Sequence, residues 1–281
     1  MQKENRNMYY YKIAGVTLAS CYILPSFETF SSEPSSADVT LEKTEEQPPK
    51  GQDLTSGAIA HRSLADGWFY HSPRTDRRGL FVSSDYTRLR MLGENGTGMA
   101  RRDEWMVRLA LECLLALRGY VSLHAAAVEV GQEAYAFSGP SGIGKSTRAA
   151  AWIQAFDDAA LISGNRPLIG VRDQVLYGVP WDGKEQCFRN VAFPLKAICE
   201  VRRADMVSVS EMSFDERRKL LMTQCFIPMW DTDTALIQMK NIAQLARTAE
   251  IVRVFCGTSP EDAAELYDLL RSSVNDPDVG K

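Results

Sequence analysis

The sequence has 281 residues, about twice the length of a typical domain, so we expect one large or two modest domains. Hydrophobic residues make up 45% and charged residues 24%, which excludes a wholly disordered, collagen-like or coiled-coil chain. The net charge of −4 gives no indication of a nucleic-acid partner or an anionic membrane surface, and no apolar run approaches the ~18 residues that span a bilayer.

Cysteine and histidine are dispersed along the chain. The six cysteines form no CxxC pair and the three histidines lie far apart, so the clustered ligands of a zinc site are missing. Several cysteines occur in apolar runs, where a thiol behaves as a small hydrophobe, and we expect no disulfide framework. Three tyrosines and Lys12 interrupt the short apolar stretch near the N-terminus, which favours structure over a signal peptide. We therefore expect a reducing, cytoplasmic location.

The first third of the chain predicts a small, mostly β subdomain at residues 1–98. Between its strands, TEEQPPKGQDLTSG at 44–57 is rich in Pro, Gly and charge, which is typical of a loop or flexible insertion. Short strands are expected within 8–22 and 36–42 and in the segments GWFYHSP, RGLFVSS and TRLRML.

A longer helix is predicted over 101–118, with Gly119 ending it at the C-cap. An apolar stripe indicates that this helix packs on a core; it includes Trp105, Leu109, Cys113 and Leu117. Two strands follow, LHAAAVEV and EAYAFSG, joined by Gly131-Gln132. Glycine at the first position of a two-residue connection predicts a type II′ hairpin.

Beyond residue 145, strands and helices alternate through a second domain at 99–273, and 274–281 form a frayed tail. The expected helices cover 145–156, 213–223, 234–248 and 259–272. The expected strands cover 159–163, 166–171, 174–178, 195–201, 206–210 and 250–256.

The segment GPSGIGKST satisfies the pattern G-x-x-x-x-G-K-[ST] and lies between an apolar strand and a helix-forming run. Glycines let backbone N–H groups curl round a phosphate, and the N-terminus of the following helix attracts the anion. Lys145 reaches the β/γ oxygens and the Ser146 hydroxyl ligates Mg²⁺. The residues predicted to bind a nucleotide are Gly139, Pro140, Ser141, Gly142, Ile143, Gly144, Lys145, Ser146 and Thr147.

The hairpin turn also predicts where His124 lies. If Gly131-Gln132 form the turn, Val130 pairs with Glu133, and His124 falls opposite the first glycine of the phosphate loop. A slip of one residue would move His124 to the other face of the sheet. Two interpretations stay open: a functional histidine at the mouth of the loop, or a strand-end histidine that makes a backbone hydrogen bond.

The stretch GYVSLHAAAVEVGQEAYAFSGPSGIGKST resembles the HPr kinase/phosphorylase family. In GTPases and motor ATPases the P-loop strand belongs to a parallel sheet, whereas here an antiparallel hairpin leads into the loop. The similarity extends to RPLIGVRDQVLYGVPWDGKEQ (166–186), to FPLKAICEV (193–201) and to the terminal strand and helix. It is greatest with the branch found beside peptide-modification genes, which includes the lasso-peptide precursor kinases.

This resemblance implies an α/β (α+β) fold like that of phosphoenolpyruvate carboxykinase, with ATP and Mg²⁺ as cofactors. It implies transfer of the γ-phosphoryl group to a serine hydroxyl of a peptide or protein. It also implies a homo-oligomer, because relatives of this fold often assemble. The acceptor itself is not specified by any local signature.

The sequence departs from the family where an acidic pair normally ends the strand after the P-loop helix. Gly164 and Asn165 stand at those positions. Glycine has no side chain and a carboxamide cannot accept a proton at pH 7, and a general base typically contributes about 10²–10⁴-fold. Asp157 and Asp158 precede the strand, and the five or six residues between them and its C-terminal end place them roughly 15–20 Å from that end of the sheet.

The loop WDGKE offers substitutes, because the resemblance brings it to the nucleotide. Lys184 and Glu185 are candidate catalytic residues beside His124 and Lys145, and the candidate metal ligands are Ser146, Asp182 and Glu185. The alternative is a polar surface turn with solvated charges. Arginine in a loop is more often a surface residue, so Arg166 and Arg189 are weaker candidates for a phosphate clamp.

Two interpretations of function therefore compete. One is a kinase in which positioning and charge neutralisation sustain turnover despite a weakened base. The other is a pseudokinase that senses ATP or recognises a peptide without chemistry, which the neutral pair Gly164-Asn165 favours. A plain ATPase or GTPase switch is disfavoured by the absence of a Walker-B acid and of an N-K-x-D sequence.

Overall fold

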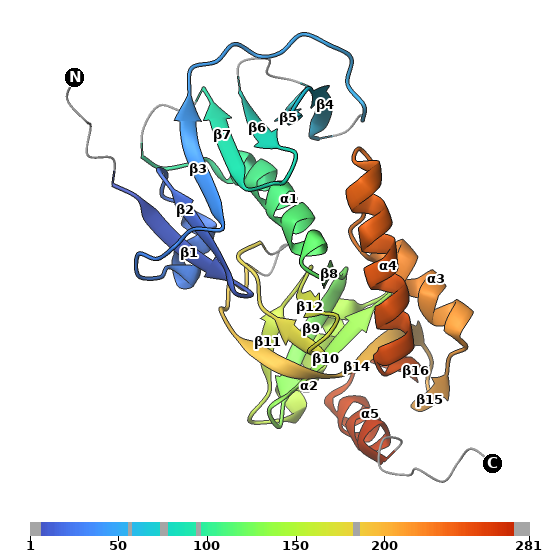
Figure 1. Ribbon diagram of the computed structural model, residues 1–281. Coiled ribbons are helices and arrows are strands. Elements are labelled where there is room, and N and C mark those ends of the chain that lie inside the picture. Colours follow the sequence, from blue (N-terminus) through green and yellow to red (C-terminus); the bar gives the residue numbers. More distant parts are fainter. Residues whose placement is uncertain (1–6, 56–57, 74–77, 94–96, 182–185, 273–281) are drawn as a thin grey trace. The chain divides into compact units, whose positions relative to one another are not determined.

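The computed structural model describes residues 7–55, 58–73, 78–93, 97–181 and 186–272 (Figure 1). The chain divides into two compact units: Met1–Arg118 with Pro228–Ala235, and Gly119–Ile227 with Leu236–Lys281. Each unit combines a large sheet with helices, so the fold is of the mixed α/β class. This division differs from the boundary predicted between residues 98 and 99, because the helix after residue 100 packs within the first unit.

Among the described residues, the first unit contains a seven-stranded sheet in the order β1-β2-β3-β7-β6-β5-β4. Strands β2, β3 and β7 run parallel, and β7, β6, β5 and β4 form an antiparallel meander. The strands are β1 (Tyr9–Ile13), β2 (Val16–Ser20), β3 (Val39–Thr44), β4 (Ala60–Leu64), β5 (Gly67–His71), β6 (Gly79–Ser83) and β7 (Arg88–Leu92). Strand β4 and the 3-10 helix η1 (Pro25–Phe30) were not predicted, and residues 45–55 contain no helix or strand, as expected of the loop.

Helix α1 (Arg101–Leu117) belongs to the first unit and ends before Gly119, whose φ is +84°. Acidic residues in its first turn complement the helix dipole, and Glu104 also accepts a hydrogen bond from the backbone N–H of Ser26 at 3.2 Å. The predicted apolar stripe was wrong at its ends, because Trp105 is 50% exposed and Leu117 is 36% exposed. The buried face lies about 100° further round the helix and includes Met106, Val107, Ala110, Leu111 and Leu114.

In the described part of the second unit, the sheet follows the order β11-β9-β10-β14-β13-β12-β8, with β16 joining β14 and β15. Strand β10 lies between β9, which is antiparallel to it, and β14, which is parallel. The strands are β8 (Tyr120–Ser122), β9 (Ala125–Val130), β10 (Glu133–Ser138), β11 (Ala160–Ser163), β12 (Leu168–Gly170), β13 (Val175–Tyr177), β14 (Ala192–Arg203), β15 (Ser208–Glu211) and β16 (Ile251–Cys256).

The hairpin of β9 and β10 has the predicted register, with Val130 opposite Glu133 and Ala125 opposite Ser138. The predicted turn type was wrong. Gly131 and Gln132 have φ values of +58° and +65°, and two positive φ values define a type I′ turn rather than type II′. Both turns suit the right-handed twist of the strands, so the register is the same.

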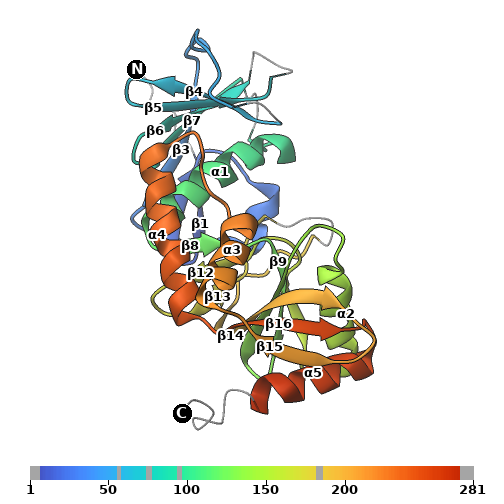
Figure 2. The same ribbon diagram turned by 90° about the vertical axis from the view of Figure 1, so that its right-hand side faces the viewer.

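Helices cover both faces of this second sheet, because successive side chains of a strand point to opposite faces. Helices α2 (Lys145–Ala155) and α5 (Pro260–Ser272) pack on the face that carries Val128, Phe137 and Val254. Helix α3 (Phe214–Gln224) and the part of α4 (Thr232–Thr248) from residue 236 onward pack on the other face. Figure 2 shows α5 running along β15 and β16.

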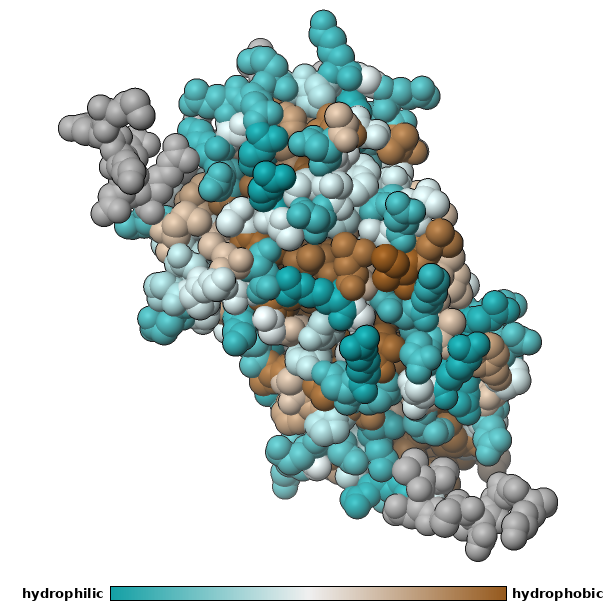
Figure 3. Space-filling model, in the orientation of Figure 1, coloured by the Kyte–Doolittle hydropathy of each residue, from teal (hydrophilic) through white to brown (hydrophobic). Residues whose placement is uncertain are grey.

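The surface seen in Figure 3 is largely hydrophilic, with apolar residues exposed in smaller patches. Within the described ranges, every helix is too short or too polar to traverse a lipid bilayer. Three cysteines, Cys113, Cys199 and Cys256, are buried among apolar residues, as the sequence predicts.

Candidate functional site

Residues 139–147 form a loop that leads from the end of β10 into the first turn of α2. Gly139, Gly142 and Gly144 all have positive φ, from +79° to +144°. At Gly144, where φ is +102°, an added Cβ would lie 2.8 Å from a guanidinium nitrogen of Arg148. The first turn of α2 contains no acidic residue, so its N–H groups and positive dipole end are available to an anion.

The Lys145 side chain folds back across this loop. Its Nζ donates to the backbone carbonyls of Gly139 at 3.0 Å and Pro140 at 3.2 Å. Burial lowers the pKa of Lys145, because charging an ammonium away from water costs free energy. Carbonyls rather than carboxylates contact this ammonium, so an anionic ligand would add a strong favourable interaction.

Arg148 holds the loop from behind. Its side chain is 2% exposed, and its guanidinium donates to the carbonyls of Ile143 at 3.2 Å, Gly144 at 3.3 Å and Cys256 at 2.6 Å. It also donates to the Arg202 carbonyl and to Sγ of Cys256, so it joins the loop to the ends of β14 and β16. Arg148 was not among the residues predicted from the sequence, because its burial follows from the packing of α2 against the ends of β14 and β16.

Replacing Arg148 by methionine should lower the free energy of unfolding by about 3 kcal/mol, because several buried carbonyls would lose their donor at about 1–3 kcal/mol each. Chemical denaturation followed by circular dichroism measures this change. Gln154→Met, on the exposed side of the same helix, is the control and should stay within about 0.5 kcal/mol of the native protein. Equal stabilities for both variants would contradict the structural role of Arg148.

A cavity of about 420 Å³ opens over the loop. The loop and the start of α2 form its floor, and His124, Gly164, Asn165 and Arg203 complete its wall. Among the described lining residues there is no aspartate or glutamate. The cavity therefore combines backbone N–H groups, hydroxyls and cations, which together suit a phosphate-bearing ligand.

Arg203 lines the cavity but was not predicted from the sequence. It is exposed and donates to the carbonyls of Gly142 at 2.8 Å and Ile143 at 3.4 Å. It reaches the loop because β14 runs parallel to β10, with Ser138 opposite Glu200. Nothing in the sequence near Arg203 indicates that pairing, so only the sheet order could reveal it.

Of the two interpretations left open for His124, the structure shows the backbone hydrogen bond, and a functional role stays a prediction. The His124 backbone N–H donates to the Gln224 carbonyl at 2.8 Å, and the His124 ring lines the cavity. Burial, followed by the nearby charges of Lys145 and Arg166, lowers the pKa of His124, whereas a hydrogen bond to the Gln224 side chain opposes this effect. The imidazole is therefore neutral at neutral pH and can accept a proton.

The other predicted site residues have different outcomes. Asp182, Lys184 and Glu185 lie outside the described residues. Asp158 accepts a hydrogen bond from the backbone N–H of Gly131 at 3.0 Å, at the end of β10 opposite the loop, as predicted. Among the described residues, no three His, Cys, Asp or Glu side chains come together as a metal site.

Arg189 is not a phosphate clamp. Its guanidinium donates to the Leu161 carbonyl and to Glu129, both at 2.7 Å, and it does not line the cavity over the loop. The ion pair with Glu129 of β9 neutralises the Arg189 guanidinium within the fold.

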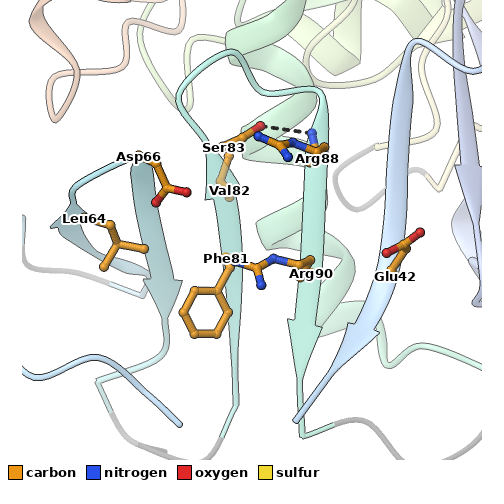
Figure 4. A pocket seen from close by; sticks show the side chains of 8 residues that line it. All are labelled: Glu42, Leu64, Asp66, Phe81, Val82, Ser83, Arg88 and Arg90. Carbon is orange, nitrogen blue, oxygen red and sulfur yellow. Dashed lines mark hydrogen bonds between the residues drawn. The ribbon is translucent and has the colours of Figure 1, made fainter. Parts of the chain in front are cut away.

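A separate cavity of about 250 Å³ lies on the sheet of the first unit (Figure 4). Glu42, Asp66, Arg88 and Arg90 are among its lining residues, and the Arg90 guanidinium lies 5.2 Å from the centre of the Phe81 ring. Its carboxylates and guanidinium groups balance in charge, and none of the residues predicted to be functional lies in it. We assign no chemistry to it.

Comparison with known proteins does not identify a family. No family model matches this chain, and the curated proteins include no significant match. The resemblance to HPr kinase/phosphorylase therefore depends only on the residues quoted above, together with the loop and hairpin that they form.

Proposed function

We propose that the second unit binds ATP and transfers its γ-phosphoryl group to a serine hydroxyl of a peptide or protein. The observation that carries this proposal is the loop from Gly139 to Thr147, which faces a cavity of about 420 Å³ lined by cations and helix N–H groups. Such a cradle favours a polyphosphate because the charged side chains among its described lining, Lys145 and Arg203, are both basic.

The residues at the start of α2 fit a nucleotide with its metal. Lys145 is placed to neutralise oxygens of the terminal phosphates, and the Ser146 hydroxyl is the natural ligand of the metal at this position. When bound, Mg²⁺ would neutralise phosphate charge and support the departure of ADP. Asp182 and Glu185 remain predicted contributors to that site.

His124 is proposed as the general base in place of the missing carboxylate. The serine O–H proton passes to the neutral imidazole while the serine oxygen forms its bond to the γ-phosphorus. The bond between that phosphorus and the bridging oxygen breaks, and ADP leaves with the electron pair. The products are phosphoserine, ADP and a protonated imidazole, which releases its proton to water.

A second candidate function is nucleotide binding without transfer. One observation favours it: the positions where the family carries acids, Gly164 and Asn165, bring no carboxylate to the cavity wall. The Asn165 carbonyl accepts a hydrogen bond from the N–H of Ala125 at 2.9 Å, so this segment is held in place beside the loop.

Labelled transfer separates the two candidates. With γ-labelled ATP, Mg²⁺ and serine peptides, the native protein should label peptide, and the variant Gly164→Asp/Asn165→Asp should label it about 10–100 times faster because a carboxylate base is restored. A silent native protein beside an active restored variant would eliminate the kinase proposal. Omitting Mg²⁺ serves as the matched blank for both proteins.

A further inference from the structure

The second unit contains another cavity, of about 220 Å³, at the same edge of the sheet as the loop. Pro140 of the loop, Glu200 and Arg202 of β14, and Lys219 and Gln224 of α3 lie around it. Of the site residues predicted from the sequence, Pro140 alone is among the described lining residues of this cavity. It lies on the face of the sheet that α3 covers.

The two cavities adjoin across the end of β14. Glu200 and Arg202 point to the α3 face, whereas Arg203 points to the cavity over the loop, as alternation along a strand requires. Pro140 and Ser141 are consecutive, and each lines one of the two cavities. A ligand in the second cavity would therefore lie close to the phosphates in the first.

His124 connects the two cavities chemically. Its ring lines the first cavity and is hydrogen-bonded to the side chain of Gln224, which lines the second. The His124 backbone N–H also donates to the Gln224 carbonyl at 2.8 Å, so the end of α3 and the histidine keep a constant separation. The Gln224 side chain therefore links the lining of the second cavity to the imidazole.

The charges in this second cavity favour an anionic side chain. Both oxygens of Glu200 are engaged, by Arg253 at 2.6 Å and Arg202 at 2.8 Å. Glu216 is held by Arg253 at 3.1 Å. Lys219 is exposed and makes no ion pair within the described residues, so the cavity carries an uncompensated positive charge.

We infer that this second cavity is the acceptor site, and that it takes a peptide segment with an aspartate or glutamate beside its serine. The inference rests on the proposed function, because an acceptor exists only if phosphoryl transfer occurs. The ammonium of Lys219 pairs with the acidic side chain, and the serine hydroxyl then points past Gln224 toward His124.

Transfer from ATP to a degenerate library of serine peptides tests this assignment. The native protein should select acidic residues beside the serine, and Lys219→Glu should raise the KM for an acidic peptide about tenfold while the KM for ATP stays within about twofold. Arg218→Glu is the matched control. Arg218 is next to Lys219 in the chain, its side chain is 55% exposed, and it lies outside the cavity, so the Arg218→Glu variant should have the KM values of the native protein.

The outcomes distinguish failure of the acceptor-site inference from failure of the proposed function on which it rests. If the native protein labels peptides without acidic preference, or if Lys219→Glu leaves the peptide KM unchanged, the acceptor site is elsewhere and the kinase proposal stands. If calorimetry detects ATP binding but no peptide in the library is labelled, phosphoryl transfer fails and the acceptor assignment fails with it. Equal effects of Lys219→Glu and Arg218→Glu would also overturn the assignment.

Discussion

Replacing Lys145 by alanine should weaken ATP binding at least ~100-fold, which corresponds to about 3 kcal/mol. The Lys145 ammonium is largely buried and its partners are the Gly139 and Pro140 carbonyls, so polyphosphate oxygens would be its first anionic contacts. A charge-assisted contact to phosphate in such a site contributes more than one at an exposed surface. Isothermal titration calorimetry with ATP and Mg²⁺ measures the change.

The control for this experiment is Lys196→Ala, a lysine of the same unit that pairs with Glu133 at 3.5 Å and does not line the cavity. Its ATP affinity should equal that of the native protein. Circular dichroism checks that Lys145→Ala remains folded, since the substitution also removes two hydrogen bonds within the loop. A folded Lys145→Ala protein with native affinity would show that the nucleotide binds elsewhere.

Replacing His124 by asparagine should slow phosphoryl transfer by about 10²–10⁴-fold, the usual contribution of a general base. The affinity of the His124→Asn variant for ATP should stay within about twofold of the native value, because the ring is proposed to take the acceptor's proton rather than to bind phosphate. Single-turnover transfer and calorimetry measure the two quantities separately. A loss of affinity equal to the loss of rate would contradict the assignment of His124 as the base.

The pH dependence provides an independent check on His124. The neutral imidazole is the active form, and its pKa is lowered below the usual 6.5. The native rate should therefore stay level as the pH falls from 8 to about 6.5 and decline only below that range. Gln224→Met should shift the decline to still lower pH, because the hydrogen bond that it removes raises the pKa of His124.

The local elements were predictable because each depends on residues close together in the chain. The loop pattern, the hairpin register and the start of α2 at Lys145 all follow from glycine positions and apolar alternation. The type of the hairpin turn was not predictable in this way. Gly131 at its first position is compatible with both type I′ and type II′, and only the positive φ of Gln132 decides between them. The buried face of α1 was predicted only in part: Cys113 is buried as expected, whereas Trp105 and Leu117 are exposed, because a helix of apolar residues offers several stripes and the sheet selects one.

The sequence alone determined the candidate phosphate loop and the position of His124 beside it, since both lie within one continuous hairpin and the turn that follows. Only the tertiary structure revealed Arg203, the role of Arg148 and the second cavity. These depend on β14 lying parallel to β10 and on α3 ending at Gln224, contacts between segments about 60 to 100 residues apart in the chain. Such pairing is decided by the packing of the whole sheet, because no local pattern specifies which strand lies beside another.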